Sequence, residues 1–285
     1  MSLVEFFATH SVFSLDEAAR TLAPPGGRTG TVERLKHHLH TGRLTLPTRA
    51  VYAVVPPGVP AARFRPDPFL VAAAARPDAV FSHHSALELL GAAHTVGTRT
   101  TLYTKRRRRS LALTGATVCF LDDPTPLAVG NRRHVGTRRV ERRGRLLQVT
   151  GPERTLVEGF HQPGHAGGLE ELVQSASGFP TLDLDLLETV LRRYGVAHLW
   201  SATGWFLERF RRSFHVPEGL LDRCERHRPR SPQYLERHRR GGTLAARWSL
   251  ILPHSLAPNR ESLMSPSLEY LERCSGETGH RVTPC

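Results

Sequence analysis

The sequence predicts an α+β protein in which a small N-terminal unit of helices and a β-hairpin precedes a larger mixed α/β domain. Residues 1–56 hold short helical segments followed by two short β-prone runs. Strand-like runs alternate with short helices between residues 79 and 150, and the chain turns helical after residue 150. We therefore expect the larger domain to have a small central sheet and a helical C-terminal layer.

The N-terminal unit begins with two short helices. The first is expected over Val4–His10, and a second over Leu15–Leu22 starts at an S-x-x-E capping box formed by Ser14 and Glu17. In such a box the serine oxygen accepts from the backbone N–H of the glutamate, whose carboxylate reaches back to the serine N–H. The segment Ala23–Gly27, with two prolines and two glycines, ends this helix.

A third helix and a hairpin complete the unit. The helix is expected over about Thr31–Thr41, and Gly42 is placed to end it. The runs Arg43–Leu46 and Ala50–Val54, separated by the breaker Pro47-Thr48, are typical of two paired strands. Three helices followed by a two-stranded wing predict a winged helix-turn-helix.

The third helix has an apolar face and a polar face. Val32, Leu35 and Leu39 share one side at helical spacing and are expected to pack inward. The polar side chains opposite and beside them can donate to phosphates or base edges if the helix enters a major groove. The candidate DNA-contacting residues are Thr31, Arg34, His37, His38 and Thr41 on the helix, with Arg43 and Arg49 on the wing. The alternative is a small helical domain that binds protein and leaves its polar face solvated.

Charge favours a polyanionic partner but is unevenly spread. The net charge is +13 and the isoelectric point is about 10.8. Residues 1–60 carry six basic and four acidic side chains, a net of +2. Residues 99–145 carry thirteen and three, a net of +10, and residues 223–247 carry eight and two, a net of +6. All but two of the 39 basic residues are arginine, a skew that genomic base composition can produce, so the excess is discounted somewhat.

Composition also bounds the class of protein. A hydrophobic content of 39% with three Trp and twelve Phe excludes general disorder. The four cysteines are far apart without CxxC spacing, no secretory signal opens the chain, and the apolar runs are too short to span a bilayer. A cytoplasmic protein without a membrane partner is expected.

The larger domain is expected over residues 66–256, after a proline-rich linker at residues 57–65 and before a loose tail at residues 257–285. Asp67 and Pro68 are typical of a helix start. In order, the expected elements up to residue 150 are a helix to Ala75, a strand at Ala79–Phe81, a helix over His83–Leu90 capped by Ser82, strands Arg99–Thr104 and Ala116–Leu121, and a hairpin of Val135–Glu141 with Arg145–Thr150.

The second half of this domain is expected to be mostly helical. Thr150 and Glu153 have the spacing of a second capping box, and Asp183 caps the strongest helical pattern. The expected elements are helices to Phe160, over Gly168–Ala176, Asp183–Tyr194, His198–Phe214 and Pro217–His227, a last helix from Ser231-Pro232 to Gly241-Gly242, and an edge strand at Trp248–Leu252.

Motifs for cofactors and metals are missing from the sequence. There is no phosphate-binding glycine motif and no nucleophile elbow, so no cofactor is expected. His37 and His40 lack a third ligand, and of His83 and His84 one is expected to pack inside and the other to face water. No metal site is therefore expected.

Two charged segments remain open to a functional interpretation. Asp122 and Asp123 at a strand end, with Glu141 as a further acid, suit a metal-dependent nuclease, although no lysine accompanies them. The run Lys105, Arg106, Arg107, Arg108 and Arg109 is expected at a hairpin turn. Its charges either keep the surface soluble or contact nucleic acid or an acidic protein.

Two motifs in the larger domain support a family resemblance. The segment Ser82–Gly91 reads SHHSALELLG after a strand, and Val149–Val157 reads VTGPERTLV at the head of a helix. With the N-terminal winged helix, they make the chain from about Phe6 to Pro253 resemble the AbiEi antitoxins of type IV toxin–antitoxin (abortive-infection) systems.

The resemblance implies a cytoplasmic regulator that is not an enzyme. Its winged helix would bind inverted repeats in the promoter and repress its own operon, with Thr31–Thr41 as the recognition helix and Arg43–Val54 as the wing. The larger domain would counteract a nucleotidyltransferase toxin encoded beside it, with no stable complex required. Related wings are richer in arginine, whereas Leu46-Pro47-Thr48 interrupts this one. A metal-dependent nuclease and a ligand-responsive transcriptional regulator are the alternatives.

Overall fold

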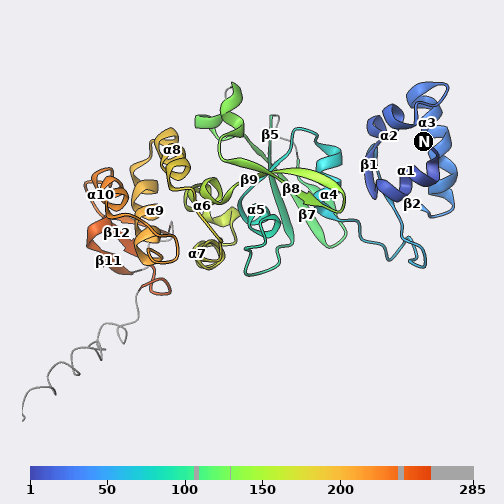
Figure 1. Cartoon of the computed structure of the whole chain (residues 1–285). Helices are drawn as coiled ribbons and strands as arrows, with labels where there is room; N and C mark the ends of the chain where they lie inside the picture. Colours follow the sequence, from blue (N-terminus) through green and yellow to red (C-terminus); the bar gives the residue numbers. More distant parts are fainter. Residues whose placement is uncertain (106–108, 129, 237–240, 258–285) are drawn as a thin grey trace, which may run out of the picture.

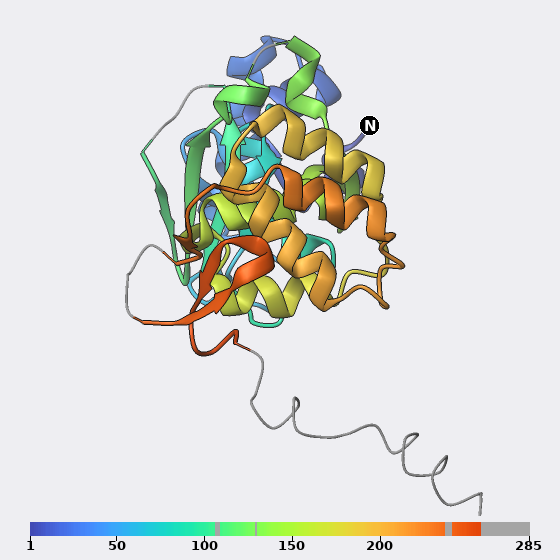
Figure 2. The ribbon, with the colours of Figure 1, turned by 90° about the vertical axis from the view of Figure 1, so that its left-hand side faces the viewer.

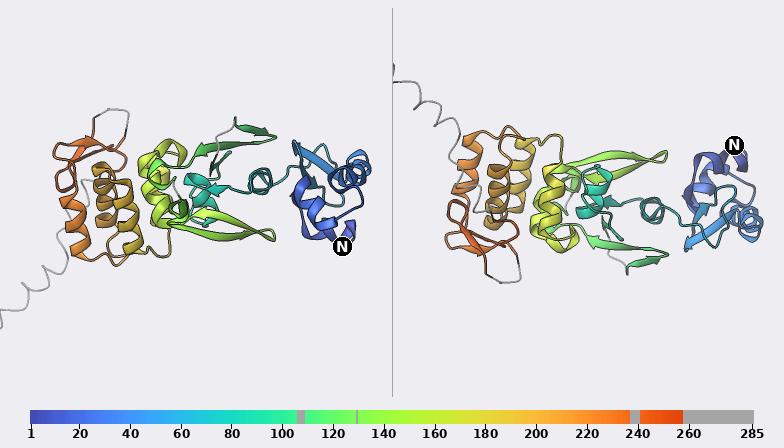
Figure 3. Two further views of the ribbon diagram at one scale, coloured as in Figure 1. Left: turned by 90° about the horizontal axis from the view of Figure 1, so that it is seen from above. Right: turned by 90° about the horizontal axis from the view of Figure 1, so that it is seen from below.

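The computed structural model describes residues 1–105, 109–128, 130–236 and 241–257. Three parts lie in a row: an N-terminal unit, a central sheet, and a helical layer that ends in a small C-terminal sheet (Figures 1 and 3). The predicted α+β class is confirmed by this mixture of helices and separate sheets. The tail at residues 258–285 and the centre of the basic run at residues 106–108 lie outside the described residues.

The N-terminal unit joins three helices to a three-stranded antiparallel sheet of order β1-β3-β2. Its elements are α1 (Leu3–Thr9), β1 (Val12–Ser14), α2 (Leu15–Leu22), α3 (Gly27–His40), β2 (Leu44–Thr48) and β3 (Val51–Val54). The hairpin β2–β3 agrees with the prediction, whereas β1 is an addition to it. Three residues are too few for a periodic signal, and β1 is specified by burial of Val12 and Phe13 against β3.

Local chemistry at both ends of α2 sets the path of this unit. Ser14 and Glu17 form the predicted capping box, with Glu17 N 3.1 Å from Ser14 Oγ and Ser14 N 3.3 Å from Glu17 Oε2. Helix α3 begins four residues earlier than predicted, at Gly27. A Cβ on Gly30 would lie 2.1 Å from the Pro25 carbonyl oxygen, so only glycine lets the turn before α3 fold back this tightly.

The central sheet has six strands in the order β6-β7-β5-β4-β9-β8. Its strands are β4 (Val80–Phe81), β5 (Arg99–Thr104), β6 (Leu111–Leu113), β7 (Ala116–Asp122), β8 (Thr137–Arg142) and β9 (Arg145–Thr150), accompanied by α4 (Pro68–Ala75) and α5 (His83–Leu89). Asp67 caps α4 as predicted, since its carboxylate accepts from the backbone N–H groups of Phe69 and Leu70. The β8–β9 hairpin turns at Arg143 and Gly144, both with positive φ.

The expected hairpin turn at Lys105–Arg109 is wrong. Strands β5 and β7 run parallel, with Arg99 opposite Thr117 and Thr104 opposite Asp122, so no tight turn can join them. Lys105 follows β5 and Arg109 precedes β6, which pairs antiparallel with β7 on the side opposite β5. The sequence patterns of β5 and β7 do not distinguish antiparallel from parallel pairing, because either pairing buries the same side chains.

Helices cover the side of the central sheet that is away from the N-terminal unit (Figures 1 and 2). They are α6 (Pro152–His161), α7 (Leu169–Ser177), α8 (Leu184–Tyr194), α9 (Ala197–Arg209) and α10 (Glu218–Arg226), with short 3-10 turns at Thr125–Leu127, Gly130–His134, Pro163–His165 and Ala246–Trp248. Helix α6 is the centre, since every residue from Pro152 to Phe160 is buried. The predicted Thr150–Glu153 box is wrong: Thr150 bonds to Thr155, and Glu153 accepts from the backbone of Asp183.

The C-terminal segment forms a small sheet rather than the predicted helix and edge strand. Its strands are β10 (Gln233–Tyr234), β11 (Thr243–Ala245) and β12 (Leu250–Leu252), in the order β10-β12-β11. Strand β12 is therefore central, and β10 pairs with it in parallel. The short helix cap Ser231-Pro232 is equally compatible with a strand start, because proline also begins extended segments.

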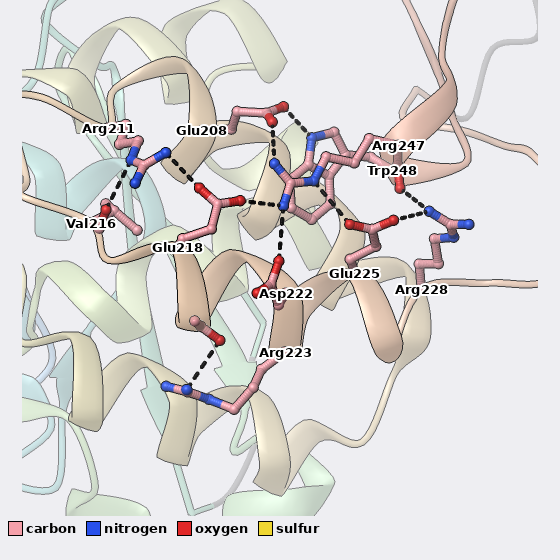
Figure 4. A network of polar contacts seen from close by, with 11 residues as sticks. Glu208, Arg211, Val216, Glu218, Asp222, Arg223, Glu225, Arg228, Arg247 and Trp248 are labelled. Carbon is pink, nitrogen blue, oxygen red and sulfur yellow. Dashed lines mark hydrogen bonds and ion pairs between the residues drawn. The ribbon is translucent and has the colours of Figure 1, made fainter.

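Arg247 fastens this small sheet to the helices (Figure 4). Its guanidinium lies within 2.8–3.3 Å of carboxylate oxygens of Glu208, Glu218, Asp222 and Glu225. The neighbouring Trp248 donates its indole N–H to Glu208 at 2.6 Å and is buried against α9. These carboxylates raise the pKa of Arg247, with the hydrogen bond to Glu218 as the largest cause.

The N-terminal unit packs on the central sheet rather than hanging from the linker. Val12, Val51 and Ala53 belong to the same buried cluster as the side chains of α4. Arg145 of β9 donates to the carbonyl of Val12 at 3.2 Å and lies 3.3 Å from the Glu17 carboxylate. Among the described helices, none combines the length and apolarity that crossing a bilayer requires.

Candidate nucleic-acid interface

Helix α3 lies on the side of the N-terminal unit that is farther from the central sheet (Figure 1). Leu35 on its inner side is fully buried, whereas Arg34 and His37 are exposed. Docking through β1, β3 and α4 leaves this outer face uncovered. Arg34 and His37, two of the predicted DNA-contacting residues, are therefore accessible to a large partner.

Thr31 does not belong to this face, contrary to the prediction. Its side chain is fully buried, and its hydroxyl donates to the carbonyl of Gly27 at 2.9 Å. The prediction follows from helical spacing, which places Thr31 beside the polar face. In the structure Thr31 packs inward about one turn before Leu35, and its hydroxyl satisfies the carbonyl of Gly27 at the start of the helix.

His38, Thr41 and Arg43 gather at the C-terminal end of α3. The His38 ring stands edge-on to Phe7 with centroids 5.0 Å apart, and the Arg43 guanidinium lies 5.4 Å from the same ring. Burial, and then the charge of Arg43, lower the pKa of His38, so this side chain is neutral at physiological pH. Thr41 donates to the carbonyl of His37 at 3.0 Å but stays exposed. Arg43 and Thr41 thus extend the polar face of α3, while His38 mainly packs.

Arg49 lies elsewhere, at the turn between β2 and β3. The length of β2 separates it from Arg43 by roughly 17–20 Å, at about 3.3 Å per residue. Its side chain is exposed and lines a groove between the N-terminal unit and the central sheet. The sequence groups Arg49 with the recognition helix, whereas the structure groups it with this groove.

The groove is strongly cationic. It has a volume of about 610 Å³, and its arginines are Arg20, Arg28, Arg49, Arg76 and Arg109. Asp16 opposite Arg28, at 2.7 Å, is its acidic side chain. Arg109 is the last residue of the basic run of the larger domain, and the docking of the two parts brings it beside the N-terminal unit. Sequence reasoning missed Arg20, Arg28 and Arg76 because only tertiary packing brings them together. Lys105 is exposed and gives its backbone N–H to Asp78 at 2.8 Å.

Both histidines of the SHHSALELLG motif are buried, contrary to the prediction that one faces water. His83 packs beside His165 and Tyr103, with ring centroids 5.3 and 5.7 Å away. Burial, followed by the charges of neighbouring groups, lowers the pKa of His83 to about 3. His84 lies 3.0 Å from Glu88, whose hydrogen bond is the main cause that raises the pKa of His84.

The carboxylates beside His84 hold a loop in place. Glu171 accepts from the backbone N–H groups of His94 and Thr95, both at 3.1 Å, and Glu88 accepts from Gly97 at 2.9 Å. Ser85 of the same motif accepts from the backbone of Thr101 at 2.7 Å. The polar residues of this motif are therefore occupied in connecting α5 to β5 and the loop before it.

The second motif supplies the arginine of a buried ion pair, and Glu158, the residue that follows the motif, supplies the acid. Arg154 and Glu158 are each 1% exposed and lie 2.7 Å apart. Arg154 also donates to the backbone carbonyls of Arg133 and Val135, and Glu158 accepts from the Tyr194 hydroxyl at 2.7 Å. Removing one partner of such a pair costs roughly 3–5 kcal/mol, because the other charge is left buried alone. The motif thus stabilises the junction of sheet and helices.

The carboxylates of the nuclease alternative do not converge. Asp122 ends β7 and Glu141 lies on β8, and three other strands separate these two in the sheet. Asp123 is paired with Arg133 at 2.6 Å. Across the described ranges, no group of three or more His, Cys, Asp or Glu side chains is arranged to hold a metal ion.

Comparison with known proteins gives a structural likeness alone. No family model and no curated protein matches the chain. Among solved structures, the chain is similar to the crystal structure of the RV2827C protein from Mycobacterium tuberculosis, with a TM-score of 0.56 and 18% sequence identity. The match covers 88% of this chain and 89% of that one, so the two share a fold over most of their length.

Proposed function

We propose that this protein is a DNA-binding transcriptional autorepressor and the antitoxin of a type IV toxin–antitoxin system, opposing a nucleotidyltransferase toxin. In this proposal residues 1–56 are a winged helix-turn-helix that reads promoter DNA through α3. The larger domain is responsible for the antitoxin activity. The protein is not an enzyme and works in the cytoplasm.

The single observation that carries the DNA-binding part is the uncovered outer face of α3. The order of three helices and a terminal hairpin is the one that a winged helix-turn-helix requires, and α3 follows α2 through a tight turn. Arg34 and His37 project from this helix without an intramolecular ion pair among the described residues. An arginine in that position can donate two hydrogen bonds to one guanine edge.

The cationic groove supports the same function at a second place. Its arginines line the side of the N-terminal unit where β2 turns into β3. A phosphate backbone that continues beyond the bases contacted by α3 would meet positive charge there. Such contacts add affinity and salt dependence without adding sequence specificity.

The test of the DNA-binding part is titration of the full chain with a duplex from upstream of its own gene, read by fluorescence anisotropy. Arg34→Ala is expected to weaken binding by about 1–3 kcal/mol, the usual value of a base-reading contact. Arg193→Ala, an exposed arginine late in α8, is the matched control. Equal affinities for the Arg34 variant and the unmodified protein would refute base reading by this residue.

The antitoxin part rests on the family resemblance of the two motifs and on the basic promoter-binding unit beside them. Its test is genetic: the chain is expressed with a nucleotidyltransferase encoded next to it. Restored growth with the full chain, retained by Arg34→Ala, is the expected result, because the opposing activity lies in the larger domain. If the nucleotidyltransferase still arrests growth when the chain is co-expressed, the antitoxin part is refuted and the DNA-binding part is unaffected.

A further inference from the structure

A second cavity lies at the carboxyl ends of the parallel strands β5 and β7, on the side covered by helices. Its volume is about 490 Å³, within the range of small-molecule sites. Tyr103 and Leu121, each one residue before the end of its strand, are in its lining, and so is the turn Asp122–Pro126. Carboxyl ends of parallel strands are where open α/β sheets bind ligands.

The cavity is electronegative although the chain as a whole is strongly basic. Asp122 and Asp123 line it, and no described Lys or Arg side chain does. His165, also in the lining, has its pKa lowered by burial first and by the charge of Arg99 second, so it is neutral at physiological pH. Arg133, which is outside the lining, pairs with Asp123 at 2.6 Å, so Asp122 is the lining acid without an ion pair among the described residues.

Two helices direct their carboxyl ends to the same cavity. Helix α6 ends at His161 and α8 at Tyr194, and both residues are in the lining. Unpaired carbonyls at a helix C-terminus carry about half a negative charge. Two such ends add to the field of the aspartates, and a cation is the ligand that this field favours.

The lining also contains an acceptor without a donor. Asp123 is 91% buried as a side chain, since 9% is exposed. Its Oδ2 accepts from Arg133 at 2.6 Å, but its Oδ1 has no hydrogen-bond partner. This Oδ1 exposes less than 1 Å² to solvent, so Asp122 is the acid that a ligand in the cavity can reach.

Aromatic rings complete the lining. The hydroxyls of Tyr103 and Tyr194 are both held by Glu158 beneath the floor, at 2.7 Å for Tyr194. The hydroxyls of Tyr103 and Tyr194 are therefore already hydrogen-bonded, and these residues present their aromatic rings to the cavity. The His161 ring stands edge-on to Tyr194, with centroids 5.7 Å apart. Aromatic faces next to carboxylates are a recurring environment for organic ammonium ions.

We propose that this cavity binds a small organic ammonium ion, with Asp122 as the acceptor and Tyr194 as the aromatic wall. An anionic ligand is disfavoured because the described lining offers no Lys or Arg. A divalent metal is disfavoured because the described side chains provide no convergent set of ligands. The site is independent of the proposed DNA-binding face, so it does not stand or fall with it.

The experiment is isothermal titration of the full chain, without DNA, with putrescine and spermidine as probes. Saturable binding is expected, weakened about fivefold or more by Asp122→Asn, which removes one ion pair. Val196→Lys places a tethered ammonium at the rim, since Val196 is exposed and in the lining, and is expected to abolish binding. Asp185→Asn is the matched control, because Asp185 is an exposed acid at the opposite end of α8.

Three results would overturn the proposal. One is the absence of saturable heat with either amine at millimolar concentration. Another is amine binding that Asp122→Asn and Val196→Lys leave unchanged, which would place the amines elsewhere on the surface. The third is saturable binding of Mg²⁺ or of adenosine monophosphate that these variants alter, which would assign the cavity to a different class of ligand. Circular dichroism of each variant establishes that it is folded.

Discussion

Acidification should destabilise this protein through His83. The ring is 1% exposed, its Nδ1 lies 3.0 Å from the Ser82 hydroxyl, and it packs against the rings of His165 and Tyr103. Burial is the main cause that lowers its pKa from 6.5 to about 3, and nearby positive charges add to it. The folded protein therefore holds this histidine neutral, whereas the unfolded chain protonates it near pH 6.5.

The sign and size follow from linkage. Because the folded pKa is depressed, the contribution of His83 to stability is complete above pH 6.5 and is lost as the pH falls toward 3. Each unit of pH below 6.5 costs about 1.4 kcal/mol, so the loss between about pH 7.5 and pH 5 is about 2 kcal/mol. His84 acts oppositely: its raised pKa gives stability below 6.5 that is lost as the pH rises through its folded value.

The assay is urea unfolding at a series of pH values for the unmodified protein and for His83→Asn. Asparagine tolerates the left-handed backbone of this position, where φ is 53°, and it does not titrate. The difference in unfolding free energy between the two proteins should shrink by about 2 kcal/mol from pH 7.5 to pH 5. Contributions of other groups, His84 included, cancel in this difference to first order.

His215→Asn is the matched control, because His215 has a φ of 51° but an exposed side chain. Its difference from the unmodified protein should stay constant over the same range. If the His83→Asn difference is equally constant, then His83 titrates normally in the fold, and its assignment as a buried neutral group is refuted.

Two further predictions concern the groove and the C-terminal sheet. The double variant Arg20→Ala, Arg109→Ala should flatten the slope of log affinity for promoter DNA against log salt concentration. The expected change is about 0.9 for each phosphate that is no longer neutralised. A slope equal to that of the Arg193→Ala control would show that the groove does not contact DNA. Gly204→Ala should destabilise by about 1–3 kcal/mol, because its Cβ would lie 2.2 Å from the ring of buried Trp248. Gly219→Ala, whose nearest neighbour is 3.7 Å away in α10, should stabilise by up to about 1 kcal/mol in thermal unfolding. A Gly204→Ala variant as stable as the unmodified protein would contradict the packing at Gly204.

Local signals in the sequence predict local structure well. The capping box at Ser14 and the N-caps at Asp67 and Asp183 all place side-chain oxygens on early backbone N–H groups, as expected. Such signals are local, because the donor and acceptor are separated by two or three residues, but tertiary contacts override the same spacing at Thr150 and Glu153. The Arg143-Gly144 turn is another example, since its positive φ values are a property of the turn itself.

Long-range arrangement is less accessible from the sequence. Strand β5 pairs in parallel with β7, and β10 pairs in parallel with β12. The local sequence patterns of these strands do not indicate whether they pair in parallel or antiparallel. The candidate site divides in the same way. The exposure of Arg34 follows from helical periodicity, whereas the grouping of Arg49 with Arg20 and Arg109 depends on how the N-terminal unit docks against α4.

The two motifs that carry the family resemblance have structural roles in this fold, and this bears on what the resemblance means. Ser85 and Glu88 hold the chain before and along β5, and Arg154 and Glu158 neutralise each other at the centre of α6. Buried residues with all these partners cannot change without loss of stability, whatever surface the protein uses. The two motifs therefore indicate the fold of the larger domain. Under the proposed function, differences in operator, toxin or ligand should lie in the exposed face of α3, the cationic groove and the acidic cavity, where substitutions leave the core intact.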